Sequence, residues 1–207
     1  DGIDVSTNGE DIDRDGETRG YIVARHRHEF GDAWTLRLDA GYVSDPLFLD
    51  SYFPRLADTS LEITNRAHLT RTEGNTLLWA QVQAQANDFI PTQWLLQTPG
   101  YTVDKLPEAG YVAIANDLLE ANAPGVLTHT WEASIGAMRL RFSEVNAEEY
   151  GLRGVNAADR AFGTAPDESL GDALRMIGLN EELVSRFDTR HEISAQLEAG
   201  PVRINPF

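Results

Sequence analysis

Four consecutive residues, Arg25-His26-Arg27-His28, form the one cluster of histidines in the sequence. On a β-strand His26 and His28 share one face while Arg25 and Arg27 share the other, because successive side chains alternate between the two faces. Two histidines with this spacing bind zinc only with a further protein ligand, and the sequence contains neither a cysteine nor an HExxH motif. We therefore expect a strand with polar side chains here and no metal site.

The sequence also lacks the motifs of common enzymes. It has no Gly-x-Ser-x-Gly nucleophile elbow, no GxGxxG loop and no GxxxxGK[ST] loop. The paired carboxylates Glu148-Glu149 and Glu181-Glu182 stand at expected helix starts, where negative charge is stabilising. We expect no catalytic residue, no cofactor and no enzymatic activity.

Composition narrows the class of protein further. The 207 residues carry a formal net charge of −16, which argues against nucleic acid as a partner because phosphate binding needs clustered Lys and Arg. Solvated loops account for this acidity, and binding of divalent cations is the alternative. The chain is 42% hydrophobic, which excludes a typical disordered composition. The sequence contains no run of about 18 apolar residues, so it predicts no membrane-spanning helix. A barrel strand, however, needs only about 9–11 residues, of which alternate ones are apolar.

Alternation of apolar and polar residues dominates the chain after residue 20. The clearest example places Trp34, Leu36, Leu38, Ala40 and Tyr42 opposite Thr35, Arg37, Asp39 and Gly41. We predict strands at 20–30, 34–43, 61–71, 76–90, 107–115, 126–142, 187–199 and from 202 onward. A soluble antiparallel sheet with one wet face gives this pattern, and so does a membrane barrel with a polar lumen.

The lengths of the connections favour the barrel. Short turns and long connections (44–60, 91–106 and 143–186) fall on opposite ends of the predicted sheet, as in transmembrane barrels. We expect a mainly β fold, an antiparallel meander that is part of an outer-membrane up-and-down β-barrel. Residues 1–19 would be a polar loop or linker, and 20–207 would belong to the barrel. Within the barrel, 143–186 would be an extracellular loop insertion, with helices starting near Asn146, Asp167 and Asn180.

Several stretches, in order along the chain, resemble the LptD family, also called organic solvent tolerance protein (OstA). The most specific is Tyr42-Val43-Ser44-Asp45-Pro46-Leu47-Phe48-Leu49-Asp50-Ser51-Tyr52-Phe53, similar to "Y-x-S-D-x-x-F-L-x-x-Y-F". Others are Arg25–Phe30 leading to Trp34, Asn87-Asp88-Phe89 with Leu106-Pro107-Glu108, and Phe187-Asp188-Thr189-Arg190-His191-Glu192 with Gly200-Pro201.

The resemblance implies a Gram-negative outer-membrane barrel that assembles lipopolysaccharide (LPS), or a related glycolipid, into the membrane. It implies an LptA-like periplasmic bridge that delivers the lipid, an LptE-like lipoprotein plug in the lumen, and lateral release between the first and last strands. Because the sequence starts at Asp1 without a signal peptide and ends in a strand that has only begun, we expect an internal piece of such a barrel.

Four arginines are candidates for lumen-side contacts with the glycolipid head group: Arg25, Arg27, Arg37 and Arg66. The competing interpretation makes them counter-charges for nearby Asp and Glu. Two other kinds of protein remain open: a soluble β-rich binding module, and another outer-membrane barrel such as a porin. The aromatic residues near the strand ends fit either core packing or an interfacial girdle.

Overall fold

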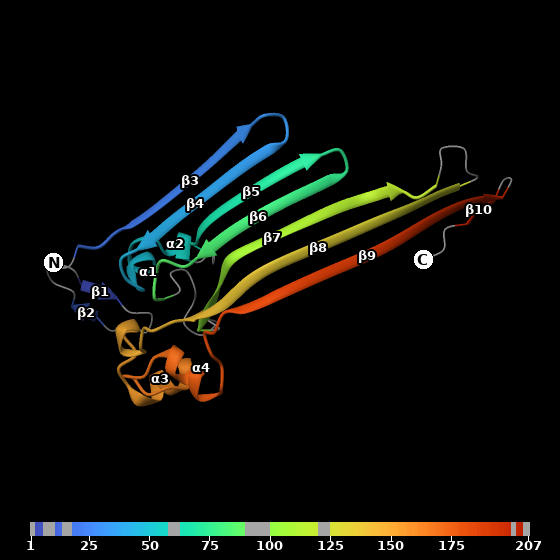
Figure 1. The fold of residues 1–207 in the computed structure, drawn as a ribbon. Coiled ribbons are helices and arrows are strands. Elements are labelled where there is room, and N and C mark those ends of the chain that lie inside the picture. Colours follow the sequence, from blue (N-terminus) through green and yellow to red (C-terminus); the bar gives the residue numbers. More distant parts are fainter. Residues whose placement is uncertain are drawn as a thin grey trace.

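The computed structural model describes residues 3–5, 11–13, 18–57, 63–89, 100–119, 125–199 and 202–204. Its main element is an antiparallel sheet of eight strands in sequence order (Figure 1). The strands are β3 (Tyr21–Phe30), β4 (Trp34–Val43), β5 (Asn65–Glu73), β6 (Thr76–Ala84), β7 (Tyr101–Asp117), β8 (Gly125–Phe142), β9 (Val184–Ala199) and β10 (Val202–Ile204). Each strand pairs with its sequence neighbour, so the predicted meander is confirmed. The sheet is open, and β3 and β10 form its two edges.

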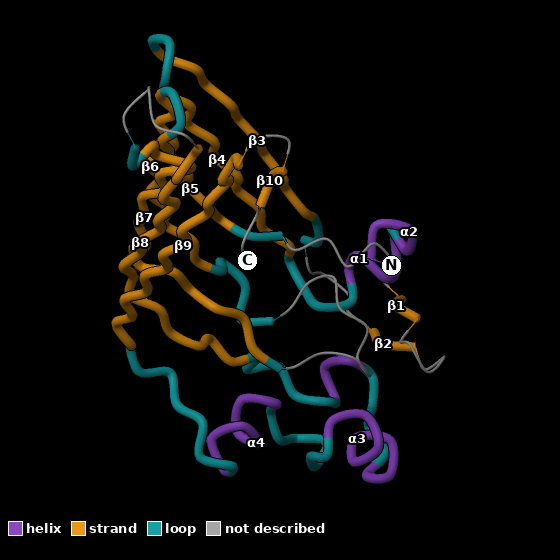
Figure 2. Tube along the Cα trace, turned by 90° about the vertical axis from the view of Figure 1, so that its right-hand side faces the viewer, coloured by secondary structure: helices purple, strands orange, loops and turns teal. Residues whose placement is uncertain are grey.

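The sheet curves along its width rather than lying flat (Figure 2). The segment expected to be a polar loop or linker contains a second, two-stranded antiparallel sheet, formed by β1 (Ile3–Val5) and β2 (Asp11–Asp13). Among the described residues, no helix has both the length and the apolar character needed to cross a membrane.

The strand register sorts the side chains of the sheet into an apolar face and a polar face. One continuous row of cross-strand neighbours on the apolar face is His28, Leu36, Leu69, Ala80, Ala109, Ile135 and Phe187. The row one residue away on the polar face is Arg27, Arg37, His68, Gln81, Glu108, Gly136 and Arg186. The alternation seen in the sequence therefore extends in register across six strand pairs.

Among the described residues, no second layer covers the apolar face over most of its extent. Val82, Ile135 and Ile193 are 46%, 62% and 66% exposed. Leu38, Ala40, Leu78 and Ala80 are exposed as well, and Leu36 is half-buried. A soluble sandwich would bury such side chains between two packed sheets, whereas a lipid-facing surface leaves them uncovered in the isolated chain.

Strand β7 is longer than the sequence predicted, because two irregularities hide its alternation. The register shifts between Lys105 and Glu108 and again between Ala113 and Asn116. Each β-bulge adds an unpaired residue and changes which face the following side chains occupy. Pro107, which has no N–H to donate to the ladder, lies inside the first shift. The predicted connection at 91–106 is correspondingly shorter, because its residues 101–106 belong to β7.

The described helices all lie at one end of the sheet, on the side of the long connections (Figure 1). They are α1 (Phe48–Tyr52), α2 (Pro54–Ala57), the 3₁₀ helix η2 (Glu148–Tyr150), α3 (Val155–Phe162) and α4 (Leu170–Met176). Predicted helix starts near Asn146 and Asp167 are confirmed. The Oδ1 of Asn146 accepts from the Glu149 N–H, and the Ser169 hydroxyl caps α4 by accepting from the Asp172 N–H. The third prediction is wrong, since no helix follows Asn180, and α3 was not predicted.

These long connections share a hydrophobic core, which lies outside the sheet proper. It contains Val43, Leu47, Phe48, Leu49, Ile63, Phe89, Val145, Ala147, Tyr150, Leu152 and Ala158. In the structure these connections join β4 to β5, β6 to β7 and β8 to β9, and each contributes to the core, the second through Phe89. The insertion therefore shares one rim with the other long loops, as predicted. The sequence also predicts a helical apolar face of Leu170, Leu174 and Ile177 that packs on the loop aromatics Phe48, Tyr52 and Trp94. Phe48 instead belongs to this core with η2 and α3, and Ile177 is 75% exposed. Trp94, another expected partner, lies outside the described residues.

Candidate functional site

The four candidate arginines lie together on the polar face, on the three adjacent strands β3, β4 and β5. Arg27 is the direct cross-strand neighbour of Arg37. In the next row of the same face, Asp39 stands between Arg25 and Arg66. The sequence could predict the shared face of Arg25 and Arg27, but the register was needed to place Arg37 and Arg66 beside them. We call these four residues the arginine patch.

Counter-charges neutralise the patch only in part. Arg66 donates to Asp39 at 3.0 Å, and Arg25 lies 3.9 Å from the same carboxylate. Arg27 is paired with Glu29 on its own strand. Within the described part of the chain, Arg37 makes no ion pair or side-chain hydrogen bond, and its neighbours in the row are Arg27 and His68. Arg25, Arg27 and Arg66 therefore have carboxylate partners, as the counter-charge interpretation expects, while Arg37 has none among the described residues. Contact with a glycolipid head group stays a prediction.

A cavity of about 670 Å³ adjoins this patch. Its charged wall consists of Arg25, Asp39 and Arg66, and its apolar wall of Tyr21, Val23, Leu56 and Ile63. Leu56 belongs to α2, so the β4–β5 connection reaches over the polar face at this end of the sheet. A cavity with one cationic and one apolar wall suits a ligand that has an anionic head and an apolar portion.

Residues of the Tyr42–Phe53 motif hold the β4–β5 connection in place over the cavity. Asp45 forms a bidentate pair with Arg19, with N–O distances of 2.9 and 2.8 Å. The neighbouring Ser44 hydroxyl accepts from the Gly20 N–H and donates to the Asp45 carboxylate. Asp45 also accepts the Leu47 N–H at 3.1 Å. The Ser-Asp pair thus joins the end of β4 to the start of β3 and sets the direction of the chain entering α1, a role the sequence did not reveal.

Ring contacts reinforce the Arg19–Asp45 ion pair and its hydrogen bonds, which together we call the clasp. The guanidinium of Arg19 lies 5.6 Å from the Phe48 ring centre and 5.3 Å from that of Tyr52. Tyr21, on the polar face of β3, contacts the Phe48 and Phe53 rings at 6.0 and 5.1 Å. The aromatic residues of the motif therefore pack against the polar face of the sheet at its rim. For Phe48 this agrees with the interpretation that the aromatic residues near the strand ends pack in a core.

Aromatic and imidazole rings on the apolar face gather toward the short-turn end instead. His26, His28, Phe30 and Trp34 follow one another with ring-centre separations of 6.1, 5.8 and 6.2 Å. His129 and His191 stack at 5.3 Å, with a nitrogen–nitrogen distance of 3.1 Å. Nowhere in the described ranges do three or more His, Cys, Asp or Glu side chains converge as a metal site would require.

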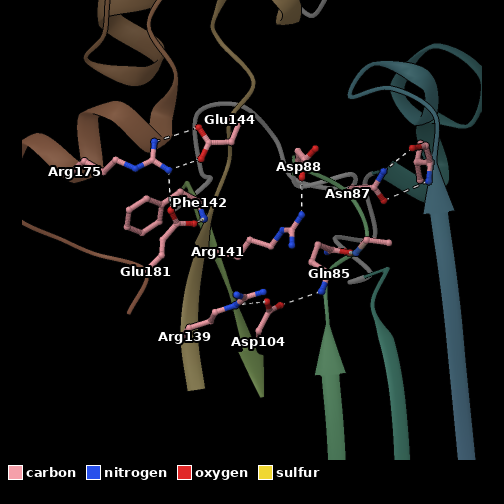
Figure 3. A network of polar contacts seen from close by, with 12 residues as sticks. Gln85, Asn87, Asp88, Asp104, Arg139, Arg141, Phe142, Glu144, Arg175 and Glu181 are labelled. Atoms are coloured by element: carbon pink, nitrogen blue, oxygen red, sulfur yellow. Dashed lines mark hydrogen bonds and ion pairs between the residues drawn. The ribbon is translucent and has the colours of Figure 1, made fainter. Parts of the chain in front are cut away.

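A second polar cluster fastens the long connections to the sheet (Figure 3). The Arg175 guanidinium pairs with Glu144 and, at 2.8 Å, with Glu181. Glu181 also accepts the Phe142 N–H at 3.0 Å, at the end of β8. The sequence placed Glu181 at a helix start, but the structure uses it to join the α4–β9 connection to β8. The hydrogen bonds that Arg175 donates to Glu144 and Glu181 raise the pKa of Arg175 further above its usual range.

The Asn-Asp-Phe motif after β6 has a similar role at the same rim. The Asn87 side chain donates to the Val43 carbonyl at 2.6 Å and accepts from its N–H at 3.4 Å. Its amide thus replaces a missing strand partner for β4, as Asn65 does for Gly41. Phe89 enters the loop core and Asp88 pairs with Arg141 at 2.6 Å.

Comparison with known proteins identifies a family for most of the sheet. Residues 17–134 match the family described as LPS transport system D, LptD. No curated protein and no solved structure matched the chain. The matched residues include the arginine patch, the Arg19–Asp45 clasp and the bulged strand β7 up to the middle of β8. Since the match spans more than half of the 207 residues, the chain belongs to the LptD family of LPS transport proteins.

Proposed function

We propose that strands β3 to β10 form part of the wall of an outer-membrane barrel that transfers LPS, or a related glycolipid, into the membrane. The apolar face contacts lipid and the polar face lines the lumen. The match to the LptD family, which is described as an LPS transport system, supports this proposal. So does the sheet itself, whose apolar side chains are uncovered while the opposite face carries charged residues in register.

The orientation follows from the cost of burying charge. An ionised side chain facing hydrocarbon is destabilising by several kcal/mol unless it is compensated. The polar face carries ionised groups across the middle of the sheet, among them Arg37, Asp39 and Glu108. On the described strands, the apolar face carries none at that level. Lipid on the polar side would therefore be far less favourable than lipid on the apolar side.

The proposed role of the arginine patch is to contact the anionic head group as it passes the lumen wall. The observation that carries this role is Arg37, which lies beside Arg27 and has no carboxylate partner among the described residues. Like charges placed directly opposite on a sheet are destabilising. An anionic phosphate bound between the two guanidinium groups would relieve this repulsion and form charge-assisted hydrogen bonds.

The remaining partners enter as part of the same proposal. An LptE-like lipoprotein would occupy the lumen, and an LptA-like bridge would deliver the glycolipid from the periplasm. The protein would reside in the outer membrane of a Gram-negative cell. A porin-like barrel would share the two-faced sheet, but it would pass small solutes and would need no cationic surface for a phosphorylated lipid.

The test uses the full-length protein with Arg27→Gln and Arg37→Gln together. A photo-crosslinking residue at Thr35, which is on the polar face next to Arg37, reports LPS in transit. We expect crosslinking to LPS to fall about tenfold, in line with the loss of hydrogen bonds to a charged group.

The matched control is Arg190→Gln, since Arg190 is also on the polar face but lies on β9 and is paired with Glu192. This variant should crosslink as the unaltered protein does. Equal losses in both variants, or no loss in either, would contradict a specific role of the arginine patch.

A further inference from the structure

The apolar face ends in ion pairs at the rim of the long connections. We call these pairs, Arg139–Asp104 and Arg141–Asp88, the ionic collar. Along β8 the side chains of Ala133, Ile135 and Ala137 share the apolar face, and the next two on that face are Arg139 and Arg141. Arg139 pairs with Asp104 of β7 at 3.0 Å, and Arg141 pairs with Asp88 at 2.6 Å (Figure 3). The apolar surface of β7 and β8 therefore gives way to charge within a single side-chain step.

These two arginines retain hydrogen-bonding capacity. A guanidinium group has five N–H donors. The Arg139–Asp104 contact uses Nε of Arg139, and the Arg141–Asp88 contact uses one terminal nitrogen of Arg141. The side chains of Arg139 and Arg141 are 42% and 30% exposed. Donors thus remain for a ligand that approaches from outside the sheet.

The collar encloses a notch of about 250 Å³. It is lined by Asp88, Arg139, Arg141, Glu144 and Glu181, with Leu140 and Phe142 of β8. Arg175 holds two of these carboxylates in place by pairing with Glu144 and Glu181. The notch therefore offers fixed donors and fixed acceptors side by side.

An apolar strip runs from the notch along the outside of the sheet. Phe187 and Ile135 are direct cross-strand neighbours, and they are 67% and 62% exposed. Leu183, four residues before Phe187, is 58% exposed and lies on the α4–β9 connection just beyond the end of the β8–β9 ladder. The strip is continuous with the apolar face, so a ligand in the notch would have apolar surface directly beside it.

We propose that this notch binds the phosphorylated sugar head of a glycolipid in the surrounding outer leaflet, with its acyl chains along Leu183, Ile135 and Phe187. The site rests on the membrane orientation of the proposed function. It faces lipid rather than the lumen, and it belongs to the protein at rest rather than to transport. Arginine donors suit phosphate and the adjacent carboxylates suit sugar hydroxyl groups. Free phosphate would gain nothing from the apolar strip and would meet the carboxylates, so a lipid is the favoured source of the phosphate.

The test places a photo-crosslinking residue at Ser185, the exposed neighbour of Ala137 on the apolar face between Leu183 and Phe187. Full-length protein is reconstituted in phosphatidylcholine vesicles that contain either lipid A or dephosphorylated lipid A. We expect lipid A to label Ser185 at least about tenfold more than its dephosphorylated form. Combined Arg139→Gln and Arg141→Gln should abolish this preference, whereas Arg139→Lys with Arg141→Lys should keep part of it.

Three results would overturn the site: equal labelling by both lipids, an unchanged preference in the glutamine variant of normal thermal stability, or competition by millimolar inorganic phosphate. Labelling at Ser185 is read at equilibrium, so it does not depend on transport. If phosphatidylcholine also fails to label Ser185, the apolar face does not meet lipid and the proposed function fails with it. Loss of the lipid A preference alone would contradict only the proposal that the notch binds the glycolipid head.

Discussion

Arg19 and Asp45 form a bidentate ion pair in which both side chains are only 7% exposed. The two residues are 26 positions apart and lie just before β3 and just after β4. The pair closes the rim end of the first hairpin, while the short turn at 31–33 closes the other end. Because Asp45 also accepts the Leu47 N–H, this single carboxylate orients both the hairpin and the connection that covers the cavity beside the arginine patch.

Replacing Asp45 by Asn should destabilise the protein by about 3 kcal/mol, because the buried ion pair with Arg19 would be broken. Arg19→Gln should cost a similar amount, and the double variant should cost less than the sum of the two. Urea unfolding of the full-length protein in detergent measures each value. Arg27→Gln is the control, since Arg27 and its partner Glu29 are both more than half exposed. Additive effects of the two single changes would show that the pair contributes no coupling.

The two faces of the sheet should respond differently to a new charge. Val82 lies near the middle of β6 on the apolar face and is 46% exposed. Val82→Arg should therefore destabilise the membrane-inserted barrel by about 2–4 kcal/mol. The control is Gln81→Arg on the polar face, where Gln81 already donates to Glu108 at 2.6 Å. Folding yield into vesicles, read by the gel mobility of unheated samples, should fall only for Val82→Arg, and similar yields for both would argue against lipid on the apolar face.

Much of the sheet was predictable because it depends on period-two alternation and on connection lengths. Strand β4 was predicted with its observed bounds, Trp34–Val43, since its alternation is unbroken. The start of β7 was missed because two register shifts and Pro107 remove the pattern on which the prediction relies. Residues 85–89 were assigned to β6, but there the chain leaves the sheet and Asn87 pairs with Val43 through its side chain. Such a substitution of side-chain for backbone hydrogen bonds leaves no periodic trace in the sequence.

The site was predictable by residue type but not by arrangement. All four arginines were proposed from the sequence, and alternation placed each on the polar side of its own strand. Which of them would be neutralised depends on the register between strands, which sets Asp39 between Arg25 and Arg66 and leaves Arg37 opposite Arg27. The clasp and the collar join residues far apart in sequence, such as Arg19 with Asp45 and Arg139 with Asp104. Local patterns carry no information about such pairs.

The attachment of the insertion at Phe142 should weaken in acid. Partial burial raises the pKa of Glu181, but the Phe142 N–H and the Arg175 guanidinium lower it by more, so the net pKa lies below the usual glutamate range. A lowered folded-state pKa contributes stability above the unfolded pKa, and this contribution is lost as the pH falls through the folded value. We expect the exchange protection of the Phe142 amide to be constant near neutral pH and to decline below the usual glutamate range.

Glu181→Gln provides the comparison for this measurement. Its amide oxygen still accepts the Phe142 N–H but carries no charge, so protection should be lower at neutral pH and should no longer decline in acid. Exchange is compared after correction for the intrinsic pH dependence of amide exchange. A glutamine variant that keeps the acid-dependent decline would assign the effect to another group, with Glu144, the other partner of Arg175, as the first to examine.

The two ends of the sheet should lie on opposite sides of the outer membrane. An epitope tag at Gly163, which ends α3 with φ of +70° and open space around its Cα, should be reachable by antibody on intact cells. The physical reason is that the charged insertion cannot enter hydrocarbon and that it shares a core with the other long connections. The matched position is Gly74 in the short turn between β5 and β6, which also has positive φ and open space where a Cβ would lie. A tag at Gly74 should be labelled only after the outer membrane is permeabilised, and the reverse pattern would invert the orientation of the barrel.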